Sequence, residues 1–271
     1  MALRVYWFGD AVGRGEVSEL TDWGRPYFEA SGSSADIFYV AYGKPPSSWD
    51  ISGSKYSVSG IPDGIEIHTY GPTTHPETVE EFKKGYLWES LLERKPDLAS
   101  KVAEQTECLI IRGSLNDPVN LNYFRNLVGL IQWLFDRGIQ GVFDPHAFLW
   151  WSAEEWNDVF EKSDTALHSH VMIFTSPENG EEWAHTRGLR KFGRPDLSVR
   201  GYPVERTTDV GNLINRFIGM QALGAVIPEG QEIKMQGFPP EMYCKHKGQL
   251  DDPDFNNVHI EIIWSNSKST G

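Results

Sequence analysis

Two histidines separated by one residue, His168 and His170, form the most suggestive metal-binding pattern in the sequence. Side chains two positions apart lie on the same face of a β-strand, and we expect a strand over residues 168–174. Two imidazoles on one face bind a transition metal when a third ligand converges on them. The residues of suitable type for that third ligand are Asp144, His146 and His185. Met172 and Phe174 share the expected face, however, which is typical of a core face with a polar end, so we predict no metal site and no cofactor.

A basic segment in an otherwise acidic chain is the second candidate for chemistry. Clustered cations can hold a carboxylate or a phosphate, and a histidine lies beside them. The candidate ligand-binding residues are His185, Arg187, Arg190, Lys191 and Arg194. The alternative interpretation is that the cations balance the surrounding acidic residues while Gly188 and Gly193 form backbone turns. We favour the alternative, and we expect any small-ligand site of this chain to lie in this segment.

The same segment resembles a known family. Residues 186–197 read Thr-Arg-Gly-Leu-Arg-Lys-Phe-Gly-Arg-Pro-Asp-Leu, which is similar to the hallmark Thr-x-Gly-Leu-x-x-Phe-Gly-x-x-Glu-Leu of the bacterial domain-of-unknown-function 4261 family. The matching residues are Thr186, Gly188, Leu189, Phe192, Gly193 and Leu197. Asp196 stands where the family usually has Glu, which keeps the charge and shortens the reach. The likeness covers roughly the second half of the chain, and because the family has no established activity, the resemblance implies a fold and not a function.

A glycine-rich stretch, Gly9-Asp-Ala-Val-Gly-Arg-Gly15, follows an expected strand over residues 3–8. A phosphate-binding loop would need a Lys-Ser or Lys-Thr pair at the start of a helix, and the stretch has neither. A metallophosphoesterase-like opening, with Asp10 as a metal ligand, would need downstream Gly-Asn-His and paired-histidine motifs, which the sequence lacks. We therefore predict a glycine turn here.

The chain is strongly acidic, because 38 Asp and Glu against 25 Lys and Arg leave a formal net charge of −13. Nucleic acids and anionic membranes need a basic footprint, so we predict neither as a partner. An acidic face attracts a basic protein instead. The two cysteines, Cys108 and Cys244, are too few for a disulfide framework and are expected to stay reduced. Because we find no signal-peptide pattern and no apolar run long enough to span a membrane, we predict a cytoplasmic protein.

One helix dominates the periodicity of the chain. Apolar residues at helical spacing from Leu121 to Phe135 predict a long helix that is buried on several sides. Asp117 and Pro118 are suited to the N-cap and the first turn, and Gly138 is suited to closing the C-terminus.

Pairs spaced as capping boxes, Thr74 with Glu77 and Ser152 with Glu155, predict two further helix starts. Strands are expected over residues 36–42, 65–70, 107–112, 168–174, 181–187, 197–200 and 258–264. After residue 166 the strands cluster and no longer alternate with helices. This order favours an α+β fold, with a largely antiparallel sheet packed by several helices. We expect a single globular domain over residues 1–271, or two packed halves of about 1–105 and 106–265.

These patterns contain no coherent catalytic set, and we favour a cytoplasmic protein-binding module over an enzyme. Aromatic residues make up 13% of the chain and can anchor an interface. An immunity-type factor that neutralises a basic toxin fits the acidic charge. The alternative is a hydrolase-type enzyme acting on an anionic small molecule or phosphoester through His185, Arg187 and the His168–His170 pair. The sequence does not indicate the oligomeric state.

Overall fold

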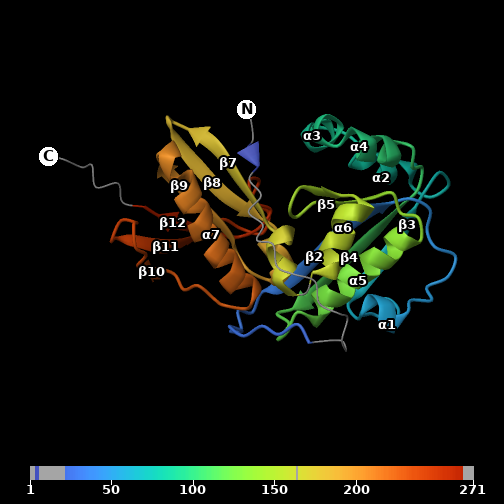
Figure 1. The fold of residues 1–271 in the computed structure, drawn as a ribbon, viewed down its shortest axis with the longest axis horizontal. Helices are drawn as coiled ribbons and strands as arrows, with labels where there is room; N and C mark the ends of the chain where they lie inside the picture. Colours follow the sequence, from blue (N-terminus) through green and yellow to red (C-terminus); the bar gives the residue numbers. More distant parts are fainter. Residues whose placement is uncertain (1–3, 6–21, 163, 265–271) are drawn as a thin grey trace. The chain divides into compact units, whose positions relative to one another are not determined.

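The computed structural model describes residues 4–5, 22–162 and 164–264. It has the expected α+β class, with helices packed on two β-sheets (Figure 1). The glycine-rich stretch over residues 9–15 and the serine-rich end of the chain lie outside the described residues.

The chain forms two compact units. Unit 1 comprises Met1–Ser18, Arg25–Ser33 and Leu167–Gly271, and unit 2 comprises Glu19–Gly24 and Ser34–Ala166. These boundaries differ from a division near residue 105. The physical reason is that strands on either side of that position pair with each other, which joins both segments in one sheet.

The sheet of unit 2 is antiparallel throughout, in the order β3-β4-β2-β5-β6. Its strands are β2 (Ser34–Tyr42), β3 (Ile65–Tyr70), β4 (Cys108–Asn116), β5 (Gly141–Asp144) and β6 (Leu149–Trp151). The central strand β2 pairs with β4 over its whole length, from Ser34 opposite Asn116 to Tyr42 opposite Cys108. This is the longest strand pairing of the unit, and it forms the middle of its sheet.

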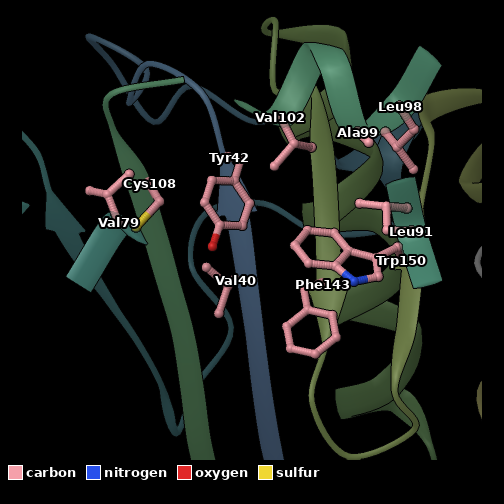
Figure 2. Close-up of a cluster of buried hydrophobic side chains, with 10 residues drawn as sticks. All are labelled: Val40, Tyr42, Val79, Leu91, Leu98, Ala99, Val102, Cys108, Phe143 and Trp150. Carbon is pink, nitrogen blue, oxygen red and sulfur yellow. The ribbon is translucent and has the colours of Figure 1, made fainter. Parts of the chain in front are cut away.

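One face of this sheet is covered by three short helices. They are α2 (Pro76–Glu81), α3 (Tyr86–Arg94) and α4 (Pro96–Ala103). The buried side chains between these helices and the sheet are Val40, Tyr42, Val79, Leu91, Leu98, Ala99, Val102, Cys108, Phe143 and Trp150. Phe143 and Trp150, from neighbouring strands, stack with ring centroids 4.5 Å apart (Figure 2). The apolar side chains of alternate strand positions thus form a continuous core on this face.

The opposite face carries α1 (Gly53–Tyr56), α5 (Asn122–Asp136) and α6 (Ala153–Glu161). Tyr39, one position before Val40, points to this side and meets the ring of Trp156 at 6.0 Å. The indole nitrogen of Trp156 donates to the carbonyl oxygen of Val128 in α5 at 3.0 Å. Unit 2 therefore has helices on both faces of an antiparallel sheet.

The long buried helix is confirmed as α5, and it ends as expected with Gly138 at a φ of 99°. Its start differs from the prediction. The helix begins at Asn122, and Asp117 forms no N-cap but has a φ of 23°. The residues before the helix pair with another segment of the chain. Leu121 N donates to Trp23 O, and Asn120 forms an isolated antiparallel β-bridge with Gly24.

Of the two expected capping boxes, only one forms. Ser152 accepts from Glu155 N at 3.2 Å, and the Glu155 carboxylate accepts from Ser152 N at 2.9 Å. Helix α2 instead begins at Pro76, after His75 in the left-handed region. Thr74 cannot cap it, because the backbone of Thr74 exchanges two hydrogen bonds with Gly71 across a tight turn.

Unit 1 contains a seven-stranded sheet in the order β1-β7-β8-β9-β12-β11-β10. The strands are β1 (Arg4–Val5), β7 (Met172–Glu178), β8 (Glu181–Arg187), β9 (Asp196–Tyr202), β10 (Glu232–Ile233), β11 (Met242–Lys247) and β12 (His259–Ile263). All neighbouring strands are antiparallel except β9 and β12, which are parallel. The helix α7 (Thr207–Ala222) contacts β8 and β9.

The structure also has three short 3-10 helices: η1 (Asp164–His170), which spans the boundary between the two units, and η2 (Leu189–Phe192) and η3 (Val204–Arg206) in unit 1. The first of them corrects the expected strand over residues 168–174, because both histidines lie in η1 and the strand begins only at Met172. None of the helices among the described residues has the length and apolar character needed to cross a membrane.

Candidate functional site

The turn between β8 and β9, residues 188–195, is built on two glycines. Gly188 has a φ of 120° and Gly193 a φ of 63°, and this left-handed region favours residues without a Cβ. Between them the chain makes the short helix η2, whose Leu189 and Phe192 are fully buried. The glycines of the family-like hallmark therefore have a backbone role in this chain.

A buried carboxylate, Asp196, closes this turn. Its Oδ1 accepts from the Thr186 hydroxyl at 2.8 Å and from Leu189 N at 3.3 Å. Its Oδ2 accepts from the side-chain amide of Asn257 at 2.8 Å. The same amide also donates to Arg194 O at 3.0 Å, which ties the turn to the segment that precedes β12. The cluster of Thr186, Asp196 and Asn257 is the polar centre of unit 1.

Burial raises the pKa of Asp196 to about 6. The hydrogen bonds from Asn257, Thr186 and Leu189 N, and the nearby charge of Arg187, act in the opposite direction and only partly offset the loss of water. Asp196 is thus a carboxyl group whose charge changes near neutral pH.

Arg194 is almost completely buried, with 2% of its surface exposed. Its Nε donates to Ala225 O, and its Nη2 donates to Glu29 O and Gly224 O, at 2.8 to 3.1 Å. Its Nη1 donates to Ser31 Oγ and to Gly193 O, at 2.9 and 2.8 Å. A guanidinium has five N–H donors, and these contacts use all five. Arg194 therefore fastens three backbone segments together.

The other cations of the segment also contact backbone. Arg187 donates to Asp254 O, and Arg190 donates to Asn256 O at 2.6 Å and Leu250 O at 3.0 Å. Lys191 is fully buried. Arg187 and Arg190 thus bind the loop that connects β11 and β12.

His185 lies in a column of rings on the sheet. Its centroid is 4.2 Å from that of Trp183 and 5.4 Å from that of Phe174, and both pairs of planes are inclined by 24°. The Arg200 guanidinium lies over the ring of Trp183, 3.8 Å from its centroid. Burial lowers the pKa of His185 to about 3, and the charges of Arg187 and Arg200 add to this effect. The imidazole is therefore neutral at physiological pH, and it packs as an apolar ring.

The histidine pair is split between two environments. His168 is exposed, with its Nε2 at 3.1 Å from Asn215 O in α7, whereas His170 is buried. Burial, followed by the charge of Lys191, holds the pKa of His170 well below its ordinary value. Within the described part of the chain, no three His, Cys, Asp or Glu side chains are grouped as metal ligands.

Asn257 is the member of the polar cluster that sequence reasoning missed. It lies 61 positions after Asp196, and no short motif surrounds it. Its place is set by the parallel pairing of β12 with β9, which brings the start of β12 beside Asp196. Only the sheet topology could have identified it.

The acidic charge is concentrated in unit 2. This unit contains 22 Asp and Glu against 11 Lys and Arg, a formal net charge of −11, which leaves 16 acidic and 14 basic residues in unit 1. On α6, Glu154, Asp158 and Glu161 follow one another at i, i+4 and i+7, which is the spacing of one helix face. All three are exposed, and none of them forms an ion pair with another described residue. We call this row the α6 acidic stripe.

Comparisons with known proteins found no relative: no protein-family model, no curated protein and no solved structure matches this chain. The likeness of residues 186–197 to the domain-of-unknown-function 4261 family therefore stays a prediction from the sequence.

Proposed function

We propose that this protein is a cytoplasmic protein-binding module whose unit 2 recognises a basic partner protein. The observation that carries the proposal is the charge distribution, since unit 2 has a formal net charge of −11 and unit 1 one of only −2. Such asymmetry steers a basic protein towards one part of the surface.

The surface of unit 2 exposes both charged and apolar side chains, on helices that cover opposite faces of its sheet. The α6 acidic stripe supplies carboxylates that no described basic residue neutralises. Helix α3 exposes two large apolar side chains, Tyr86 at 55% and Leu92 at 48%. Tyrosine is one of the residue types enriched at the hot spots of protein interfaces, and the exposed leucine adds apolar area.

An immunity-type factor that neutralises a basic toxin is the biological role we favour. Such a protein acts by occupying its partner, so its own surface charge matters and it needs no catalytic group. The alternative, a hydrolase-type enzyme acting on an anionic small molecule or phosphoester, receives less support. His185, its proposed acid–base group, is stacked between rings and has a pKa of about 3, which suits proton transfer at neutral pH poorly.

The test is capture of partners from the native cells on the immobilised protein, followed by titration calorimetry with the purified partner. The charge-reversal variant carries Glu154→Lys, Asp158→Lys and Glu161→Lys. A control variant carries Glu205→Lys, Glu241→Lys and Asp251→Lys, which are exposed in unit 1 and produce the same change in net charge.

We expect a basic partner whose affinity falls about tenfold or more in the α6 variant, while the unit 1 variant binds like the wild type. Equal loss in both variants would mean that only overall charge matters, and it would contradict docking on unit 2. Failure to enrich any basic protein over an unrelated acidic bait would remove the proposal.

A further inference from the structure

Unit 1 contains a pocket of about 350 Å³. Its apolar lining comes from Val226, Ile227 and Val258, each of which is half-buried. Pockets for small organic molecules range from about 300 to 1,000 Å³ and are lined mainly by apolar groups with a few polar ones. The size and the lining both suit a small molecule.

The charged side chains that line this pocket, Arg194 and Lys247, are both cationic. The other polar side chains of the lining are Ser31, Ser33 and the imidazoles of His246 and His259. None of the described residues that line the pocket is Asp or Glu, although the whole chain has a formal net charge of −13. Carboxylates lie behind this lining, where Glu261 pairs with Lys247 and Asp252 lies 4.0 Å from His259, but none of them forms the pocket wall. A wall whose charged side chains are cationic favours an anionic ligand.

Two of these groups are held in place by the protein itself. The five hydrogen bonds of Arg194 fix its positive charge at the wall of the pocket. His246 Nε2 lies 2.8 Å from Ile227 O, and because a carbonyl oxygen only accepts, this nitrogen carries the hydrogen. The pocket therefore keeps its shape and charge before any ligand arrives.

Two other groups can respond to a ligand. Lys247 is exposed and pairs with Glu261, so its ammonium can move to an anion in the pocket. His259 is 9% exposed and stacks on Phe255 with ring centroids 3.9 Å apart. Its Nδ1 has no hydrogen bond within the described part of the chain and lies 4.0 Å from an oxygen of Asp252. His259 lines the pocket together with Lys247, so both side chains can contact the same ligand.

We infer that this pocket binds a small organic anion, a carboxylate or phosphate group carried on an apolar body. The anionic group contacts Lys247 and His259, and the body lies on Val226, Ile227 and Val258. The pocket shares no residue with the α6 acidic stripe, and this inference does not rest on protein binding by unit 2.

Titration calorimetry of the full chain with three probes tests the inference. Phenyl phosphate and benzoate both combine an anion with an apolar ring, and benzyl alcohol retains the ring without the charge. We expect both anions to bind, and the tighter of the two identifies the preferred anionic group. Benzyl alcohol should bind about tenfold or more weakly than either anion.

Variants locate the binding. Lys247→Gln should weaken anion binding about fivefold. Lys234→Gln is the matched control, because Lys234 is another exposed lysine of unit 1 that pairs with a glutamate, Glu232, outside the pocket. Ser33→Trp introduces a bulky ring at an exposed lining position and should abolish binding without disturbing the core. Equal affinities in all variants, equal affinity for benzyl alcohol, or no binding of either anion would each overturn the inference.

Discussion

The hydroxyl of Thr186 donates a 2.8 Å hydrogen bond to the buried carboxylate of Asp196, and it accepts one of 2.8 Å from the backbone nitrogen of Leu197. Thr186 belongs to β8, and the other two residues begin β9. The pair therefore closes the turn between the two strands and aligns their ends. Because both side chains are almost inaccessible to water, this contact should contribute measurably to the stability of unit 1.

Replacing Thr186 with Val removes the hydroxyl and keeps the shape of the side chain. Asp196 Oδ1 then loses one donor, and Leu197 N loses its acceptor inside the core. We expect the free energy of unfolding to fall by about 1–3 kcal/mol. Urea denaturation followed by circular dichroism measures this change. The control is Thr69→Val on β3, where the threonine is exposed and the change should stay within about 0.5 kcal/mol. Equal effects in both variants would show that the buried bond contributes nothing.

Asp196 should make stability depend on pH in an unusual direction. Its pKa of about 6 in the folded protein exceeds the ordinary 3.8, so the folded state holds more protons between these values. Stability from this group is therefore fully present below about pH 4 and is lost as the pH rises through about 6. The loss is about 3 kcal/mol for a shift of roughly two pKa units.

The check is the difference in unfolding free energy between the wild type and Asp196→Asn from about pH 4 to 7. The variant lacks the titrating group, so the difference should change with pH in favour of the variant as the pH rises. A difference that stays constant over this range would contradict the raised pKa of Asp196.

His185 should show the opposite dependence. Its folded pKa of about 3 lies below the ordinary 6.5, so the unfolded chain binds the proton more readily. The wild type therefore loses stability as the pH falls from about 6.5 towards 3, and by pH 5 the loss is about 2 kcal/mol. His185→Phe retains a stacking ring between Trp183 and Phe174 and should lack this loss.

Thermal or urea unfolding of His185→Phe and the wild type at pH 7 and pH 5 measures the effect. The control is His68→Phe on β3, because the side chain of His68 is 42% exposed. An advantage of the His185 variant that does not grow at pH 5 would be inconsistent with a buried neutral imidazole.

Two glycines within helices should respond differently to alanine. A Cβ at Gly129 in α5 would overlap the carbonyl oxygen of Tyr56 in α1. Gly129→Ala must therefore displace backbone and should cost more than about 2 kcal/mol. At Gly219 in α7 the nearest atom to a Cβ is His168 Cε1 at 3.5 Å, an ordinary contact. Gly219→Ala should stabilise the protein by up to about 1 kcal/mol through helix propensity, and denaturant melts of both variants test the contrast.

Local patterns predicted several elements correctly where a single stretch of chain decides the outcome. The strands over residues 65–70 and 181–187, the long helix α5 and the capping box of Ser152 and Glu155 all follow from side-chain periodicity or short-range hydrogen bonds. The same capping pattern at Thr74 and Glu77 was wrong, because the backbone of Thr74 is bound to Gly71. A capping pattern in the sequence fails to form a cap when the backbone groups that it needs are already hydrogen-bonded to other residues.

The sequence by itself determined the acidic charge, the α+β class and the position of the basic segment, because composition and periodicity do not depend on distant contacts. Only the tertiary structure decided what that segment does. The pairing of β9 with β12 brings Asn257 to Asp196. Arg194 binds Gly224, 30 positions away, and Glu29, 165 positions away. Asp196 and His185 become buried only when these segments pack together. Their pKa shifts follow from that burial, because the groups that displace water from them come from distant parts of the chain.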